Sequence, residues 1–119
     1  MDSALFDSGK AAIRSDSQPI LDNMSVMLVS FADYIRMIRI EGHTDNVPIY
    51  SARFHSNWEL STSRAVTVLE YLLENSGIVP EKFSAVGYGE FRPVDTNDTE
   101  EGKAKNRRVD FVIESINVK

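Results

Sequence analysis

The sequence has 119 residues, of which 42% are hydrophobic, which suits one domain spanning residues 1–119 with a core of its own. Its formal net charge of −5 argues against a nucleic-acid-binding protein, because no basic excess exists to neutralise phosphates. Cysteine is absent, which excludes a disulfide framework and any thiolate nucleophile or metal ligand. No apolar run is long enough to predict a membrane-spanning helix in these residues.

The first third of the chain predicts a strand end, a helix and a strand. Residues 4–6 are typical of the end of a strand, and Ser17 can cap a helix with Pro19 in its first turn. Ile38 and Ile40 alternate with polar residues, which predicts a half-buried strand over 37–41 that Gly42 ends. The apolar stripe of the helix is expected to contain Leu21, Met24, Leu28, Phe31 and Ile35.

A loop over residues 46–55 precedes a second helix. Ser56 and Glu59 have the spacing of a capping box, in which each side chain accepts a hydrogen bond from the backbone amide of the other residue. The helix is therefore expected to start near Asn57 and to stop around Gly77. Its predicted buried residues are Trp58, Ala65, Val68, Leu69 and Leu72.

The last third predicts two more strands. Residues 83–87 form one. Residues 95–105 are typical of a solvated loop that could include one helical turn. Val109, Phe111 and Ile113 alternate with polar residues in a closing strand. The order βαβαβ followed by a final β predicts an α+β fold. We expect a two-layer sandwich in which a mixed sheet carries the helices on one face.

Asp45 and Arg64 are the central candidate residues. Asp45 lies at the exit of the strand over 37–41 and Arg64 in the first turns of the following helix, so they could face one cleft and bind a zwitterion. Alternatively, the two charges pair with each other or with solvent. Asn57 shares a helix face with Arg64, where its amide and the free N–H groups of the first turn could bind a carboxylate. It could equally satisfy only its own backbone.

Catalytic and metal sites are less well supported. His43, Asp45 and His55 contain the ligand types of zinc but not a recognised ligand spacing, so we expect no metal site and no cofactor. Ser61 lies inside a predicted helix and lacks a Gly-x-Ser-x-Gly elbow. We therefore expect no enzyme, with a small wall-modifying hydrolase as the alternative from another class.

Three motifs resemble the OmpA-like peptidoglycan-binding domain. They are Gly-His-Thr-Asp at 42–45, Asn-Trp-Glu-Leu-Ser-Thr-Ser-Arg-Ala at 57–65 and Asn-Arg-Arg-Val at 106–109. The Val-Pro-Ile segment at 47–49 and the long loop before Asn57 most resemble the MotB family of flagellar stator subunits. Porin and lipoprotein members of the OmpA/Pal type, which tether the envelope, are the alternative within the family.

The resemblance implies that the domain binds the diaminopimelate of the peptidoglycan stem peptide. Asp45 would bind the ammonium group and Arg64 the carboxylate, the latter in bidentate geometry. Asn57 would lie beside them. A period of two puts Arg107 and Arg108 on opposite faces, and we expect Arg108 to border the cleft.

The resemblance also implies the partners and the location. The domain would form a homodimer and would belong to a longer single-pass inner-membrane protein, with this part in the periplasm. A stator A subunit of the MotA type would join it through the transmembrane region. Its function would be to anchor the flagellar motor stator to the cell wall in bacterial motility.

Overall fold

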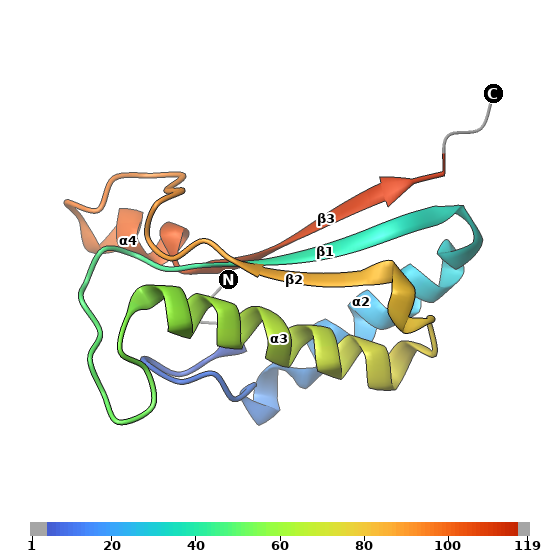
Figure 1. Ribbon diagram of the computed structural model, residues 1–119, viewed down its shortest axis with the longest axis horizontal. Coiled ribbons are helices and arrows are strands. Elements are labelled where there is room, and N and C mark those ends of the chain that lie inside the picture. The colour runs from blue at the N-terminus through green and yellow to red at the C-terminus, as the bar shows by residue number, and fades with distance from the viewer. Residues whose placement is uncertain (1–4, 117–119) are drawn as a thin grey trace.

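The computed structural model describes residues 5–116, in which three strands form one mixed sheet with the order β2-β1-β3. Strand β1 (Ile35–His43) runs parallel to β2 (Phe83–Gly87) and antiparallel to β3 (Arg108–Ser115). Helices α2 (Gln18–Ser30) and α3 (Asn57–Ser76) lie together below the sheet (Figure 1). This arrangement confirms the α+β class and the mixed sheet with helices on one face.

Four shorter elements complete the described chain. Helix α4 (Glu100–Asn106) leads directly into β3, and single 3₁₀ turns precede α2, β1 and β2. The turns span Ser15–Ser17, Ala32–Tyr34 and Pro80–Lys82. In the part of the chain that the structure describes, no helix combines the length and the apolar character required to cross a bilayer.

The core lies between the sheet and the two long helices. Ile38 and Ile40 of β1 have no exposed surface, and they pack against Leu21 and Leu28 of α2 and Leu72 of α3. Alternation along β1 puts one side of the strand into this core, so the residues between the isoleucines face the other side of the sheet. In β3 only the first part of the core-facing side is buried: Val109 is buried, whereas Ile113, near the end of the strand, is exposed.

Two predictions in the first third of the chain are wrong. The expected first strand is reduced to one isolated bridge between Phe6 and Ile13, while Ala4 lies outside the described residues. Helix α2 ends at Ser30, so Phe31 is 57% exposed and Ile35 already belongs to β1. A turn of 3₁₀ helix rotates the chain out of the helical period, which ends the apolar stripe at Leu28.

Gly42 lies within β1 and does not end it. A Cβ atom at Gly42 would lie 2.1 Å from the carbonyl oxygen of Ser61 in α3. Real Cβ atoms do not approach backbone atoms so closely, so only glycine allows β1 and α3 to pack at this distance. The strand continues to His43 and thus carries the histidine of the first motif.

Both ends of α3 lie where the sequence predicted them, but the Glu59 side chain accepts its hydrogen bond from a different amide than expected. Ser56 Oγ accepts a hydrogen bond from the Glu59 amide at 3.3 Å, and Gly77 closes the helix in the left-handed conformation with φ 72°. The Glu59 carboxylate accepts from the amide of His55 at 3.0 Å, one residue before the expected partner. Trp58 is not buried: it is 51% exposed and stacks on Phe91.

The cap of α3 gives a first testable expectation. A Ser56→Ala variant loses the side-chain acceptor of the Glu59 amide, and we expect the free energy of unfolding to fall by about 1 kcal/mol. Urea denaturation followed by circular dichroism measures the difference. Ser15→Ala, at an exposed serine, is the control, and equal stability of the two variants would contradict a contribution from the cap.

Candidate functional site

A cleft of about 730 Å³ lies where β1 leaves the sheet. Its walls come from the segment 6–9, the loop after β1, the first turns of α3 and the junction of α4 with β3. Charged side chains of both signs line it. The basic ones are Arg14, Arg64, Lys103 and Arg107, and the acidic ones are Asp7, Asp45 and Glu100.

Asp45 is held in one orientation by bonds to both carboxylate oxygens. Oδ1 accepts from the amide of Val47 at 3.0 Å, a local turn that begins the loop after β1. Oδ2 accepts from Nη1 of Arg107 at 2.8 Å. The carboxylate is 10% exposed and the Arg107 side chain 29% exposed, so this ion pair is partly shielded from solvent. It joins the exit of β1 to the start of β3.

Arg107, not Arg108, borders the cleft. The two arginines do diverge as the period of two predicted, but the choice between them was wrong. Arg108 is paired with His43 in the antiparallel register, and residues directly opposite each other share a face of the sheet. Arg108 therefore lies on the face that His43 occupies, and its Nε donates to Asp110 at 3.1 Å. The sequence alone does not give this register.

Asn57 lines the cleft and holds the loop after β1. Its Nδ2 donates to the carbonyl oxygens of Val47 at 3.1 Å and Asp45 at 3.4 Å. These acceptors are ten and twelve residues away, so the side chain does more than satisfy its own helix. The bonds fix the backbone that presents the Asp45 carboxylate.

Arg64 forms the floor of the cleft and is 3% exposed. Its Nε donates to the carbonyl oxygen of Lys10 at 2.8 Å and its Nη2 to that of Asp7 at 3.1 Å. The guanidinium also lies 5.0 Å from the centre of the Phe6 ring. Arg64 thus ties the segment before α2 to α3, a role that sequence spacing did not indicate. The structure does bring Arg64 and Asp45 into one cleft.

The other candidate groups do not assemble. His55 is exposed and stacks on Tyr50, whereas His43 is buried on the sheet. Ser61 donates its hydroxyl to the carbonyl of Trp58 at 3.1 Å and accepts from the amide of Gly89 at 2.9 Å. This hydroxyl joins α3 to the turn after β2, which explains its burial without a catalytic role.

Comparison with known proteins agrees with the fold and the motifs. The model of the OmpA family matches residues 5–107. Motility protein B of Bacillus subtilis strain 168 is 49% identical over 112 residues, which cover 94% of this chain and 42% of that protein. The chain therefore spans less than half the length of this relative.

Two solved structures share the whole fold. The periplasmic domain of Helicobacter pylori MotB has a TM-score of 0.86 at 28% identity, with 96% of this chain and 72% of that chain covered. The cell wall anchor of the T6SS from Pseudomonas aeruginosa has a TM-score of 0.87 at 35% identity, with 96% and 77% covered. Because the family match extends over most of the sequence and the fold agrees, the chain belongs to the OmpA family.

Proposed function

We propose that this chain is a non-catalytic domain that binds peptidoglycan and anchors a flagellar stator to the cell wall. The observation that carries the proposal is the cleft in which Asp45 and Arg64 lie together. The similarity to motility protein B and to a cell wall anchor supports it. The loop over 46–56 and the identity to motility protein B favour a stator over an envelope-tethering porin or lipoprotein.

The ligand would be the diaminopimelate of the stem peptide, whose free end carries an ammonium and a carboxylate on one carbon. The Asp45 carboxylate would bind the ammonium group. Arg64 would bind the carboxylate from the floor of the cleft, with Arg107 as a second guanidinium beside it and Asn57 fixing the loop. Each charge-assisted hydrogen bond contributes about 1.5–3 kcal/mol. After the ordering cost of binding, roughly micromolar to millimolar affinity is expected for one site.

The partners follow from the same proposal. We infer that the domain forms a homodimer and that the longer protein meets a MotA-type subunit through a single transmembrane segment. Two weak sites on one dimer would hold the wall much more firmly than one, because the second binding event is intramolecular. The similarity to periplasmic domains supports a place between the inner membrane and the wall.

Sedimentation with insoluble peptidoglycan tests the function. Asp45→Asn keeps an oxygen for the Val47 amide but removes the charge. Arg64→Lys keeps the charge but removes the guanidinium, together with its hydrogen bonds to the Lys10 and Asp7 carbonyls. We expect each variant to bind about tenfold more weakly than the wild type, the effect of losing about 1.4 kcal/mol. Circular dichroism verifies that each variant is folded.

The matched controls are Asp33→Asn and Arg36→Lys, at exposed positions that do not line the cleft. We expect both to sediment like the wild type. A wild type that stays in solution, or controls that lose binding as strongly as the cleft variants, would refute the proposal. Release of soluble muropeptides during the incubation would favour the hydrolase alternative.

A further inference from the structure

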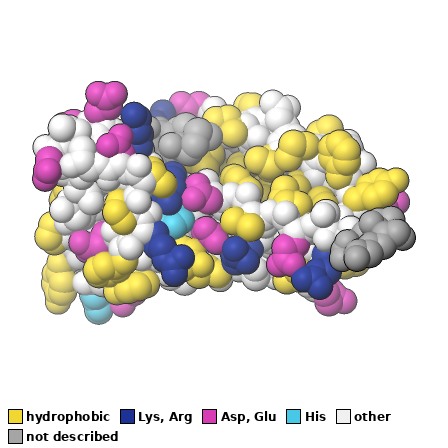
Figure 2. All heavy atoms as spheres, turned by 90° about the horizontal axis from the view of Figure 1, so that it is seen from above, with side chains coloured by type: hydrophobic (Ala, Val, Ile, Leu, Met, Phe, Trp, Pro, Cys, Tyr) yellow, Lys and Arg dark blue, Asp and Glu magenta, His cyan; other side chains and the backbone are white. Residues whose placement is uncertain are grey.

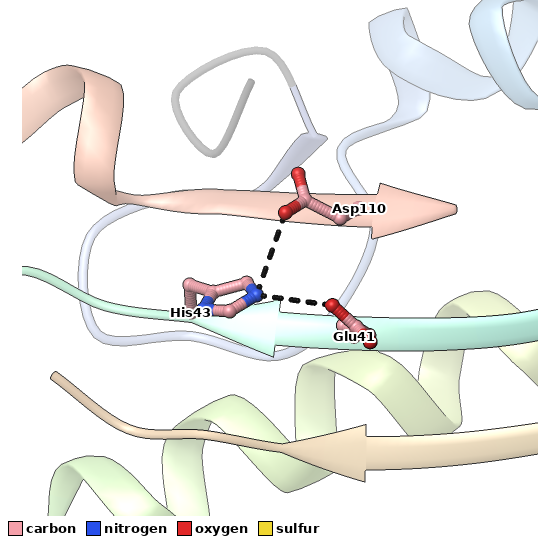
Figure 3. A group of neighbouring side chains, drawn as sticks. All are labelled: Glu41, His43 and Asp110. Atoms are coloured by element: carbon pink, nitrogen blue, oxygen red, sulfur yellow. Dashed lines mark ion pairs between the residues drawn. The ribbon is translucent and has the colours of Figure 1, made fainter. Parts of the chain in front are cut away.

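A second group of polar side chains lies outside the cleft. Glu41 and His43 are two residues apart on β1 and so share a face, and Asp110 on β3 is directly opposite Glu41 in the register. This face is the one away from α2 and α3. Figure 3 shows the three side chains converging, with Nε2 of His43 directed at both carboxylates. Figure 2 shows the molecule from this side, where acidic and basic side chains lie next to one another.

His43 is the unusual member of the group. It is 3% exposed, and neither of its ring nitrogens has a hydrogen-bond partner. Nε2 lies 3.5 Å from Asp110 Oδ2 and 3.6 Å from Glu41 Oε1, which is too long for a hydrogen bond. Buried polar atoms in folded proteins nearly always have a partner. An imidazole without a hydrogen-bond partner and two carboxylates, each of which already accepts one bond from an arginine, therefore converge on one point without hydrogen bonds to each other.

The two separations from His43 Nε2 fit a metal ion between the three groups. A tetrahedral Zn²⁺ ion with bonds of about 2.0–2.2 Å holds its ligand atoms about 3.4 Å apart. The two distances from His43 Nε2 are within a few tenths of an ångström of this value. One ligand atom from each of the three residues lies within 4.8 Å of the other two. We propose that Glu41, His43 and Asp110 bind a divalent transition-metal ion of the Zn²⁺ type, with the fourth position open to water.

The surroundings hold each ligand in the form that a metal requires. Burial lowers the pKa of the His43 imidazole, and the positive charge of Arg108 acts in the same direction against weaker opposing effects of Asp110 and Glu41. The ring is thus neutral at neutral pH, as a ligand must be. It stacks on Tyr88 with centroids 5.2 Å apart, which fixes its plane.

The carboxylates are oriented by outer partners. Arg39 donates to Oε2 of Glu41 at 2.8 Å, so that Oε1 is the atom facing His43. Arg108 donates to Oδ2 of Asp110 at 3.1 Å, and one carboxylate oxygen can accept this bond while it binds an ion. Such second partners are usual around metal ligands. The bound ion would join β1 to β3 beside the residues that enter the cleft.

The test uses the untagged chain, freed of metal with a chelator and then titrated with Zn²⁺ alone in a calorimeter. We expect one ion to bind per chain and the melting temperature to rise with the concentration of Zn²⁺. Co²⁺ alone, as a spectroscopic substitute, should give the intense visible absorption of a four-coordinate ion. His43→Gln and Asp110→Asn should each weaken Zn²⁺ binding by about 100-fold. Replacing a residue that only orients a metal ligand already weakens binding by about 10- to 100-fold, and these two variants change a ligand itself.

His55→Gln is the matched control, because this second histidine is exposed and lies outside the group; it should bind Zn²⁺ like the wild type. If His43→Gln does not fold, Asp110→Asn decides, since the Asp110 side chain is 42% exposed and lies on the face of the sheet away from the core. Absence of saturable binding by the wild type overturns the proposal. So does binding that His55→Gln removes and Asp110→Asn leaves unchanged.

Discussion

A Gly42→Ala variant should lose about 3 kcal/mol of its free energy of unfolding, at the upper end of what added volume in a packed core costs. The new Cβ atom would meet the carbonyl oxygen of Ser61 at 2.1 Å and its carbonyl carbon at 2.9 Å. Both are backbone atoms of helix α3, so no side-chain rotation relieves the contact. Helix α3 must move away from β1, and the core between them opens.

The measurement is urea denaturation, with Gly77→Ala as the comparison. Gly77→Ala also replaces a hydrogen atom by a methyl group, but nothing lies within 4 Å of the added Cβ atom. Its cost is only that of the left-handed conformation, about 1 kcal/mol. If Gly42→Ala is no less stable than Gly77→Ala, the close approach of strand and helix is not what requires glycine.

Replacement of Asn106 by alanine should have an effect of similar size. The Asn106 side chain has no exposed surface, and its oxygen accepts from the amides of Val94 and Asp95 at 2.8 and 3.0 Å. Its nitrogen donates to the Asp95 carbonyl at 2.9 Å and to Asn97 Oδ1 at 2.8 Å. Alanine removes all four bonds, and groups left without a partner cost about 1–3 kcal/mol each when they stay buried. We expect a total loss of about 3 kcal/mol, since the loop can partly rehydrate.

Hydrogen exchange locates this loss. The amides of Val94 and Asp95 should exchange faster in Asn106→Ala. The exchange rates of the β1 amides should rise only as far as the lower free energy of unfolding of the whole domain requires. Asn75→Ala is the control, because Asn75 is an exposed asparagine whose single side-chain bond goes to its own helix. Since Arg107 follows Asn106 directly, weaker sedimentation with peptidoglycan is also expected. Unchanged exchange at residues 94 and 95 would contradict the role assigned to Asn106.

Local signals predicted the elements that depend on local chemistry. Ser56 and Gly77 fixed the ends of α3 because a cap and a left-handed glycine act on neighbouring backbone groups. The alternation of Ile38 and Ile40 identified the central strand, since the side-chain period of a strand is a property of the chain itself. Asp45 and Arg64 could be assigned to one cleft because Asp45 follows the predicted central strand and Arg64 lies in the first turns of the next predicted helix.

The errors concern residues whose surroundings come from distant parts of the chain. Trp58 lies seven residues before Ala65 and so shares its helix face by spacing, but its partner is Phe91 on a surface turn, which helical spacing cannot reveal. Arg108 was preferred to Arg107 because the register of β1 with β3 was unknown. The function of Gly42 also depends on the helix that passes beside it, and so does the tie between Arg64 and the segment before α2.

The pairing of β1 with β3 determines at what stage of synthesis the cleft can form. Asp45 and Arg107 are 62 residues apart, and among the described elements β3 leaves the ribosome after β1, α3, β2 and α4. A growing chain that stops before Arg107 has its central strand, yet it lacks one neighbour of that strand and one wall of the cleft. Contacts of such separation form late, because the intervening loop must close first. The cleft proposed to bind peptidoglycan is therefore complete only when synthesis of this domain is almost finished.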